Sequence, residues 1–319
     1  MRQAFYALAL LAGTATAQPG AYPTQPLKLV VGFAAGGPSD IVARAFADQA
    51  AKPLGQPIIV ENKPGANAVL ATEAVASAKA DGLTLLGAAT NHTMIPALYA
   101  SRIRFDAAKS FAPICTLATS ATVLVVGPAM PVKSVAEFLA RVKAKPGSAT
   151  YATPGQGSSP HLATEQFGKL TGTSMVHVPY KGAAPAVTDL LGGQVDLSFA
   201  TVGSVLPHLK SGKLRALAVA SRQRSSLLPD VPTFEEAGVK DFVVDTWYGL
   251  LAPAGTPADV LRVLTREATE FSRSPAVRER LAGAGLEPGG VCGDAFAQQI
   301  AREIESNTRV ARELNLKAE

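Results

Sequence analysis

Two segments of this chain share one pattern: an apolar strand, a glycine-rich loop and then an amphipathic helix. The first passes from residues 27–31 through the loop 33–40 into a helical pattern. The second passes from residues 149–152 through the loop 153–160 into another. The first turn of a helix has N–H groups without intrahelical acceptors, and the helix dipole favours negative charge there. Each loop is therefore a candidate anion site, although one such loop alone would be an ordinary turn with a good helix cap.

Short apolar runs alternate with helical patterns along the first part of the chain. Residues 58–60 and 83–87 predict strands, and residues 41–51 and 70–78 predict helices. This alternation is typical of a parallel α/β sheet, in which ligands bind beyond the carboxyl ends of the strands. The loop 33–40 and the polar loop 90–93 both lie at such ends. The second loop offers Asn91 and His92 as candidates, and His92 is either a cleft residue or an exposed loop histidine.

Two apolar runs are longer than the others and enclose the second glycine loop. We interpret residues 114–126 and 243–251 as strands that cross between two lobes. The chain is then an α/β protein with two lobes around a hinge: lobe 1 is 18–122 plus 249–319, and lobe 2 is 123–248. Within lobe 2 we expect strands at 149–152, 175–178, 194–199 and 214–220, helices at 131–143, 161–170 and 183–191, a short helix that follows the loop 201–204 and ends at 210, and a loop with a short helix at 230–238. The segment from Pro257 onward is predicted to be helical and to pack on lobe 1.

The N-terminus predicts export. Arg2, the apolar run 4–12 and the triplet Ala15-Thr16-Ala17 are typical of a signal peptide, here 1–17, cleaved after Ala17. No later segment has the roughly 18 uncharged apolar residues of a membrane span. A formal net charge of +5 with scattered basic residues and few aromatics argues against a nucleic-acid partner. Cys115 and Cys292 could pair or remain free in an exported protein. No metal or cofactor is expected.

Nine short stretches, in order, together carry a resemblance to a known family. They are FAAGGPSD at 33–40, ENKPGA at 61–66, DGLTL at 81–85, YATPGQGSSPH at 151–161, VPYKG at 178–182, LLGGQVDL at 190–197, KLRALAV at 213–219, PDVP at 229–232 and WYGLLAPAGTP at 247–257. The mature chain resembles the Bug family of periplasmic solute-binding proteins, the TctC-like receptors of tripartite tricarboxylate transporters. This implies a monomeric two-lobed protein of the type II, Venus-flytrap class that closes on a carboxylate and delivers it to a membrane permease, without catalysis.

The resemblance also implies which residues hold the ligand. In such proteins the two glycine loops bind a carboxylate through backbone N–H groups, hydroxyls and ordered water. The matching positions here are Phe33, Gly37, Ser39, Asp40, Thr153, Gly157, Ser158 and His161. Further candidates are Asn91, His92, Ser159, Tyr180, Lys181, Ala200 and Thr201. Asp40 could cap the helix instead, Lys181 could be a solvated loop residue, and Trp247 either lines the cleft or packs in the hinge.

Two departures from the family pattern bear on the ligand. In the first loop Ala35 replaces a proline and Pro38 replaces a hydroxyl residue, which removes one side-chain donor. Many relatives carry an aspartate at the position of Ala200, where amino-acid binders can use it for an ammonium group. A buried ammonium without that partner is strongly disfavoured. We therefore expect an amine-free ligand: a di- or tricarboxylate, or an aromatic acid.

Two other functions fit parts of the sequence. The same fold could sense a ligand and signal to a sensor kinase. A secreted hydrolase could use Ser158 or Ser159 with His161, but the G-x-S-x-G nucleophile motif is absent and no acid is evidently placed to orient the histidine.

Overall fold

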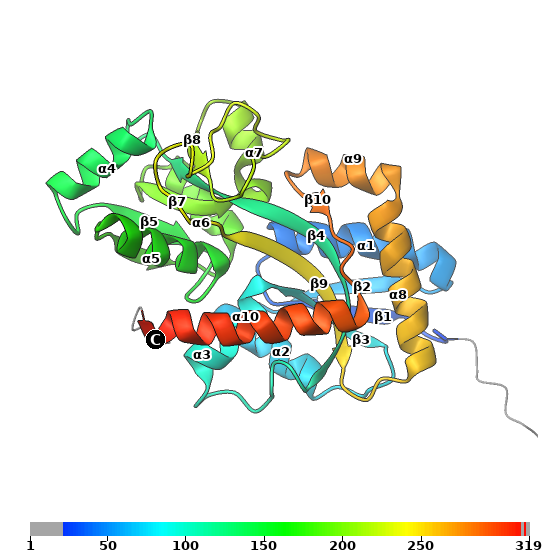
Figure 1. The fold of residues 1–319 in the computed structure, drawn as a ribbon. Coiled ribbons are helices and arrows are strands. Elements are labelled where there is room, and N and C mark those ends of the chain that lie inside the picture. The colour runs from blue at the N-terminus through cyan, green and yellow to red at the C-terminus, as the bar shows by residue number, and fades with distance from the viewer. Residues whose placement is uncertain (1–21, 314–315, 317–319) are drawn as a thin grey trace, which may run out of the picture.

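The structure is a computed structural model that describes residues 22–313 and 316. The protein has a mixed α/β fold with strand order β2-β1-β3-β9-β4-β7-β5-β6, and β8 and β10 also pair with β4 (Figure 1). The strands are β1 (Leu27–Val31), β2 (Ile58–Asn62), β3 (Thr84–Ala89), β4 (Phe111–Val126), β5 (Thr150–Thr153), β6 (Val176–Pro179), β7 (Leu197–Thr201), β8 (Arg215–Val219), β9 (Asp245–Pro253) and β10 (Glu287–Pro288). The α-helices are α1 (Pro38–Leu54), α2 (Val69–Ala76), α3 (Ile95–Tyr99), α4 (Val135–Ala144), α5 (Ser159–Thr171), α6 (Ala183–Leu191), α7 (Val202–Lys210), α8 (Ala258–Arg273), α9 (Pro275–Gly283) and α10 (Gly293–Glu313). Short 3₁₀ helices are η1 (Ala66–Ala68) and η2 (Thr90–Thr93).

The first lobe is the part built on β1, β2 and β3. These three strands are parallel, with β1 in the middle, and β9 adds to the edge of β3 in the antiparallel direction. Leu27, Leu29 and Val31 of β1 are buried with apolar side chains of α1 and α8 in one core. The parallel α/β arrangement predicted for this part of the chain is confirmed.

The hinge consists of β4 and β9, which run side by side between the lobes (Figure 1). The 16 residues of β4 serve both sheets: β4 pairs with β9 from Phe111 to Ala121 and with β7 from Thr122 to Val126. The two long apolar runs are therefore crossing strands, and the two-lobed fold is confirmed. The exact lobe boundaries, at 122/123 and 248/249, stay predictions.

The second lobe is the part built on β5 to β8. Here β5 pairs in parallel with β6 and β7, and α5 packs on β7. Its core contains five phenylalanines whose rings contact one another: Phe138, Phe167, Phe199, Phe234 and Phe242. Because Phe167 belongs to α5, this buried aromatic core holds α5 in place on the lobe.

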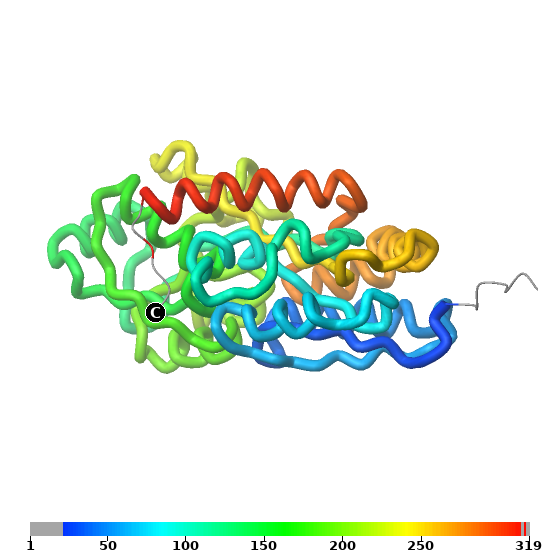
Figure 2. The backbone as a smooth tube through the Cα atoms, turned by 90° about the horizontal axis from the view of Figure 1, so that it is seen from below, coloured from blue at the N-terminus to red at the C-terminus, as the bar shows by residue number. Residues whose placement is uncertain are grey.

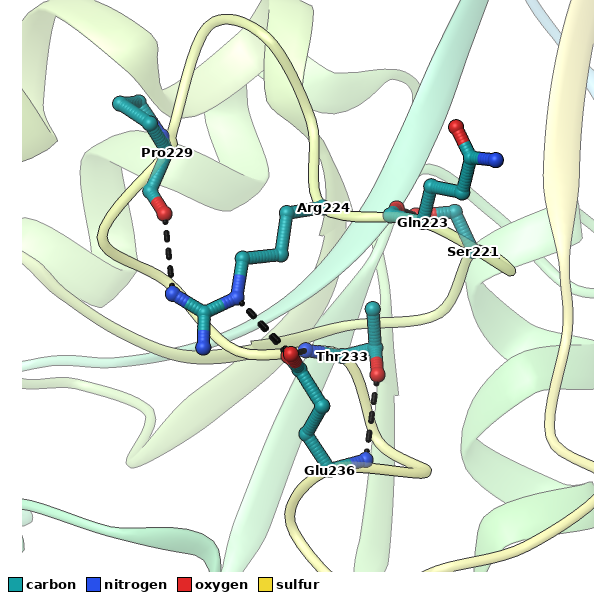
Figure 3. Close-up of polar contacts among 6 residues, drawn as sticks. All are labelled: Ser221, Gln223, Arg224, Pro229, Thr233 and Glu236. Atoms are coloured by element: carbon teal, nitrogen blue, oxygen red, sulfur yellow. Dashed lines mark hydrogen bonds and ion pairs between the residues drawn. The ribbon is translucent and has the colours of Figure 1, made fainter.

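The segment that links β8 to β9 differs from the prediction. Residues 230–238 form hydrogen-bonded turns rather than a helix. Thr233 and Glu236 bond each other reciprocally, from N–H to Oε2 (2.8 Å) and from N–H to Oγ1 (3.1 Å). Arg224 then holds the Glu236 carboxylate at 2.9 Å and the Pro229 carbonyl at 3.1 Å (Figure 3). The side chains close one turn like a capping box, but Gly238, at φ 89°, ends it at once.

The C-terminal part contains more elements than the sequence predicts. Pro275 separates α8 from α9, and β10 then pairs with β4. A disulfide joins Cys115 in β4 to Cys292, just before α10, which answers the question that the sequence left open. From there α10 runs along the first lobe toward the second (Figures 1 and 2). None of the described helices is long and apolar enough to cross a membrane. The predicted signal peptide lies outside the described residues.

Candidate functional site

A pocket of about 50 Å³ lies between the lobes, where α1 and α5 begin. Its walls come from both glycine loops, from the ends of β3 and β7, and from β9. The lining residues are Phe33, Gly37, Pro38, Ser39, Ala89, Thr90, Asn91, Pro154, Ser158, Ser159, Pro160, Ala183, Thr201, Thr246 and Tyr248. No Asp, Glu, Lys, Arg or His occurs among these lining residues of the described chain. The polar character of the pocket therefore comes from hydroxyls, one amide and the backbone.

The start of α1 forms the first side of the pocket. Gly37 is the N-cap, and no side chain caps it. The N–H groups of Asp40 and Ile41 both bond the Gly37 carbonyl, at 3.0 Å each. Pro38 has no N–H, so the N–H of Ser39 is the first-turn donor left beside the pocket.

Asp40 braces this loop and is not among the residues that line the pocket. Its buried carboxylate accepts from the Gly36 N–H (3.0 Å), from Arg44 Nε (3.0 Å) and from Asn62 Nδ2 (2.9 Å). Asn62 also donates to the Phe33 carbonyl (3.0 Å). Burial alone would raise the pKa of Asp40, but these hydrogen bonds and the charge of Arg44 outweigh it and lower the pKa.

Replacing Asp40 is expected to destabilise the protein. Asp40→Ala should lower the free energy of unfolding by about 1–3 kcal/mol, because buried donors lose their acceptor. The pKa of Asp40 is lower in the folded state, so its contribution is complete above the unfolded pKa near 4 and is lost as the pH falls through the folded pKa. Urea unfolding of both proteins at pH 7 and in steps below about pH 4 measures this. Asp48 lies in the same helix as Asp40 and forms an exposed ion pair with Arg280, so Asp48→Ala should lower the free energy of unfolding far less. Equal losses in the two variants would contradict the bracing role of Asp40.

The start of α5 forms the opposite side of the pocket. Ser158 is the N-cap, and its Oγ accepts from the His161 N–H at 3.4 Å, which leaves its own hydroxyl hydrogen free to donate. Ser159 Oγ accepts from Thr246 Oγ1 of the hinge strand β9 at 3.0 Å. Ser159 can then donate its hydroxyl hydrogen to a ligand.

Behind this loop, two stacked histidines hold it in place. His161 Nδ1 accepts from the Gly157 N–H at 3.0 Å, and the ring stacks on His177 at 4.1 Å between centroids. Thr153 Oγ1 lies 2.7 Å from His177 Nε2. Burial, and then the neighbouring His177, lower the pKa of His161 to about 3, so this ring is neutral. Thr153, Gly157 and His161 therefore shape the loop, and they are not among the residues that line the pocket.

Four other candidates lie away from the pocket. His92 is buried within the first lobe, where Nε2 is 2.7 Å from the Ala107 carbonyl oxygen, and burial lowers its pKa to about 4. The Tyr180 hydroxyl donates to Asp189 at 2.7 Å. Lys181 is exposed, and Ala200 packs in the second-lobe core. Each of these side chains meets a nearer partner, or solvent, in the folded chain.

Seven predicted residues do line the pocket, and sequence reasoning missed others. The predicted residues among the lining are Phe33, Gly37, Ser39, Asn91, Ser158, Ser159 and Thr201. The lining residues that no site prediction included are Pro38, Ala89, Thr90, Pro154, Pro160, Ala183, Thr246 and Tyr248. Thr246 and Tyr248 alternate along β9 and so share one face, a signal that the sequence contains. Trp247 between them donates to Glu303 at 2.8 Å and packs on Phe296, so it belongs to the hinge packing.

The lobes touch each other around the pocket. The Ala34 N–H donates to the Lys181 carbonyl at 3.3 Å, from one lobe to the other. Nearby, Asn91 donates through Nδ2 to the Asn67 carbonyl at 2.8 Å. Asn91 Oδ1 and both polar side-chain atoms of Asn67 are buried without a hydrogen-bond partner among the described residues.

Two α/β lobes, joined by crossing strands around a pocket at two helix N-termini, define a solute-binding protein. Residues 42–316 match the family described as the tripartite tricarboxylate transporter family receptor, TctC, and the chain belongs to this periplasmic family. It is 37% identical to Protein BugT of Bordetella pertussis over 297 residues, which cover 93% of this chain and 91% of BugT.

Two solved structures of similar proteins contain carboxylates. R. palustris Rpa4515 with adipate has a TM-score of 0.89 and 32% identity, covering 92% of this chain and 99% of that one. MatC from Rhodopseudomonas palustris with bound malate has a TM-score of 0.84 and 33% identity, covering 91% and 99%. Adipate and malate are both dicarboxylates without an amino group.

Proposed function

We propose that this protein captures a small, amine-free carboxylate in the interlobe pocket and delivers it to the permease of a tripartite tricarboxylate transporter. One observation carries the proposal: the N-termini of α1 and α5 face the same pocket from opposite lobes. A carboxylate there would accept hydrogen bonds from the N–H group of Ser39 and from the hydroxyls of Ser158 and Ser159. It would also lie at the positive ends of two helix dipoles.

The absence of acidic side chains from the described lining supports the amine-free ligand. An ammonium group would find only hydroxyl, amide and carbonyl oxygens there, with two helix dipoles of unfavourable sign. A ligand with two carboxylates could face both helix ends at once. This favours a di- or tricarboxylate over an aromatic acid with a single carboxylate.

Binding without catalysis suits the site. The ring nitrogen Nδ1 of His161 is occupied by the Gly157 N–H, and the pKa of that histidine is lowered to about 3, so it is a poor general base. The ligand instead stabilises the closed form, since only the closed form brings both helix ends to it. The closed protein then docks on the permease as a monomer after export and removal of residues 1–17.

The side-chain donors should contribute measurably to affinity. Ser39→Ala and Ser158→Ala should each weaken binding by about 1 kcal/mol or more, roughly fivefold, through loss of a hydrogen bond to a charged group. Ser211→Ala, at an exposed helix end, is the matched control and should bind like wild type. Calorimetric titration measures all three. If both pocket variants bind as well as the control, the hydroxyls take no part.

A thermal-shift screen of carboxylates tests the proposed function itself. We expect at least one di- or tricarboxylate to raise the melting temperature, because a ligand that binds only the folded state stabilises it. Labelling of Ser158 or Ser159 by a serine-reactive phosphonate, lost in His161→Ala, would contradict the proposal and support a hydrolase.

A further inference from the structure

Leu162 lies in an unexpected place for a residue of the second lobe. It belongs to α5, yet the buried apolar cluster that contains it is otherwise made of first-lobe residues. These are Val69, Met94, Ile95, Leu98, Tyr99 and Ala311. Leu162 is only 5% exposed. Its burial therefore depends on the closed arrangement of the two lobes.

The surrounding contacts follow the same seam. Gly157 approaches Leu98 so closely that a Cβ atom at Gly157 would lie 2.1 Å from Leu98 Cδ1. Further along, Lys169 Nζ lies 3.1 Å from Glu313 Oε2, which joins α5 to the end of α10 (Figure 1). Both charges are about half exposed, so this ion pair adds little. The apolar contact of Leu162 is the larger stabilising part of the seam.

Other atoms at the seam oppose closure. Asn67 and Asn91 bury polar side-chain atoms that have no partner within the described chain. Closure without a ligand therefore combines an apolar gain at Leu162 with a polar loss at the two asparagines. A ligand then adds the contacts that shift the balance toward the closed form.

We propose that Leu162 is a latch, and that its insertion between α3 and α10 sets ligand affinity from outside the pocket. This inference extends the proposed function, and only its statement about ligand affinity rests on that function. Ser159, which lines the pocket, and Leu162 lie three residues apart on one side of the first turns of α5. A ligand that brings the start of α5 closer to α1 therefore also brings Leu162 into contact with α3 and α10.

The latch acts on the closed population, so it should change affinity without touching the ligand. Apparent affinity falls in proportion to the closed fraction. We expect Leu162→Ala to weaken binding of malate or adipate about tenfold or more, mainly through faster dissociation. Leu170→Ala removes the same atoms from an exposed site on the same helix, where Leu170 is 55% exposed, and should bind like wild type. Leu162→Met keeps the apolar volume and should restore most of the affinity.

A ligand-free measurement separates this proposal from the proposed function. Dyes attached through unnatural amino acids at Ile59 in β2 and Lys143 in α4 would report opening and closing in single molecules, with the disulfide intact. We expect the dwell time of the closed state to shorten about tenfold in Leu162→Ala and to stay unchanged in Leu170→Ala. Equal closed dwell times in Leu162→Ala and wild type would overturn the latch. If no carboxylate of the thermal-shift screen binds wild type, the proposed ligand class fails, while the dwell times still decide the latch.

Discussion

Ser159→Asp is expected to reduce carboxylate binding by about 100-fold or more. The new carboxylate would stand in the pocket against the carboxylate of the ligand. Two like charges about 4 Å apart repel each other by about 4 kcal/mol at the effective dielectric constant of a protein surface. Folding should persist, because an acidic residue in the first turn of a helix suits the helix dipole.

A neutral substitution of similar shape isolates the charge. Ser159→Asn should lose far less affinity than Ser159→Asp, and both should unfold at nearly the same temperature as wild type. Calorimetric titration with the best ligand of the screen, alongside thermal unfolding, gives the comparison. Equal affinities for the Asp and Asn variants would mean that the start of α5 does not face the ligand carboxylate.

Removing the disulfide should have the largest effect on stability. The bond joins cysteines 177 residues apart, so it restricts a long loop of the unfolded chain. Chain-entropy arguments and measured cases give a loss of about 2–5 kcal/mol for Cys115→Ala with Cys292→Ala. At roughly 2–4 °C per kcal/mol for a chain of this size or slightly smaller, the melting temperature should fall by about 4–20 °C.

The location of the disulfide gives the experiment its control. Neither cysteine lines the pocket, so the double variant should bind ligand like wild type at temperatures where it is folded. Calorimetry with and without reductant should show that reductant lowers the melting temperature of wild type and leaves the variant unchanged. A variant that melts with wild type would show that the packing of α10 on β4 suffices without the bond.

The architecture could be predicted because it depends on patterns that extend over many residues. Alternating apolar runs marked β1, β2 and β3, and the length of the run ending at Val126 distinguished a hinge strand from an ordinary one. The two glycine loops could be paired because their patterns repeat. Helix α9 buries only Val277 and Leu281, so its sequence carries little periodic signal, and the two-residue β10 exists only through its pairing with β4.

The individual site residues were harder to predict. Their polar atoms form hydrogen bonds with residues that become neighbours only in the folded chain, and the sequence does not show these contacts. The Asp40 carboxylate accepts hydrogen bonds from Arg44 and Asn62, and His161 Nδ1 accepts one from the Gly157 N–H. His92 turns inward to the Ala107 carbonyl. Each has the chemistry of a binding residue, and each supports the fold instead. The residues that line the pocket are uncharged, and residue type alone does not reveal which of them reach it.

One comparison tests the central claim most directly: titration of the purified protein with carboxylates and their amino counterparts. Malate and aspartate differ in a single position, where hydroxyl replaces ammonium, and adipate and 2-aminoadipate differ by one ammonium. A pocket lined by two helix N-termini and no acidic side chain should bind an amine-free acid and bind its amino counterpart at least about 100-fold more weakly. An amino acid that binds as tightly as its amine-free counterpart would contradict the account.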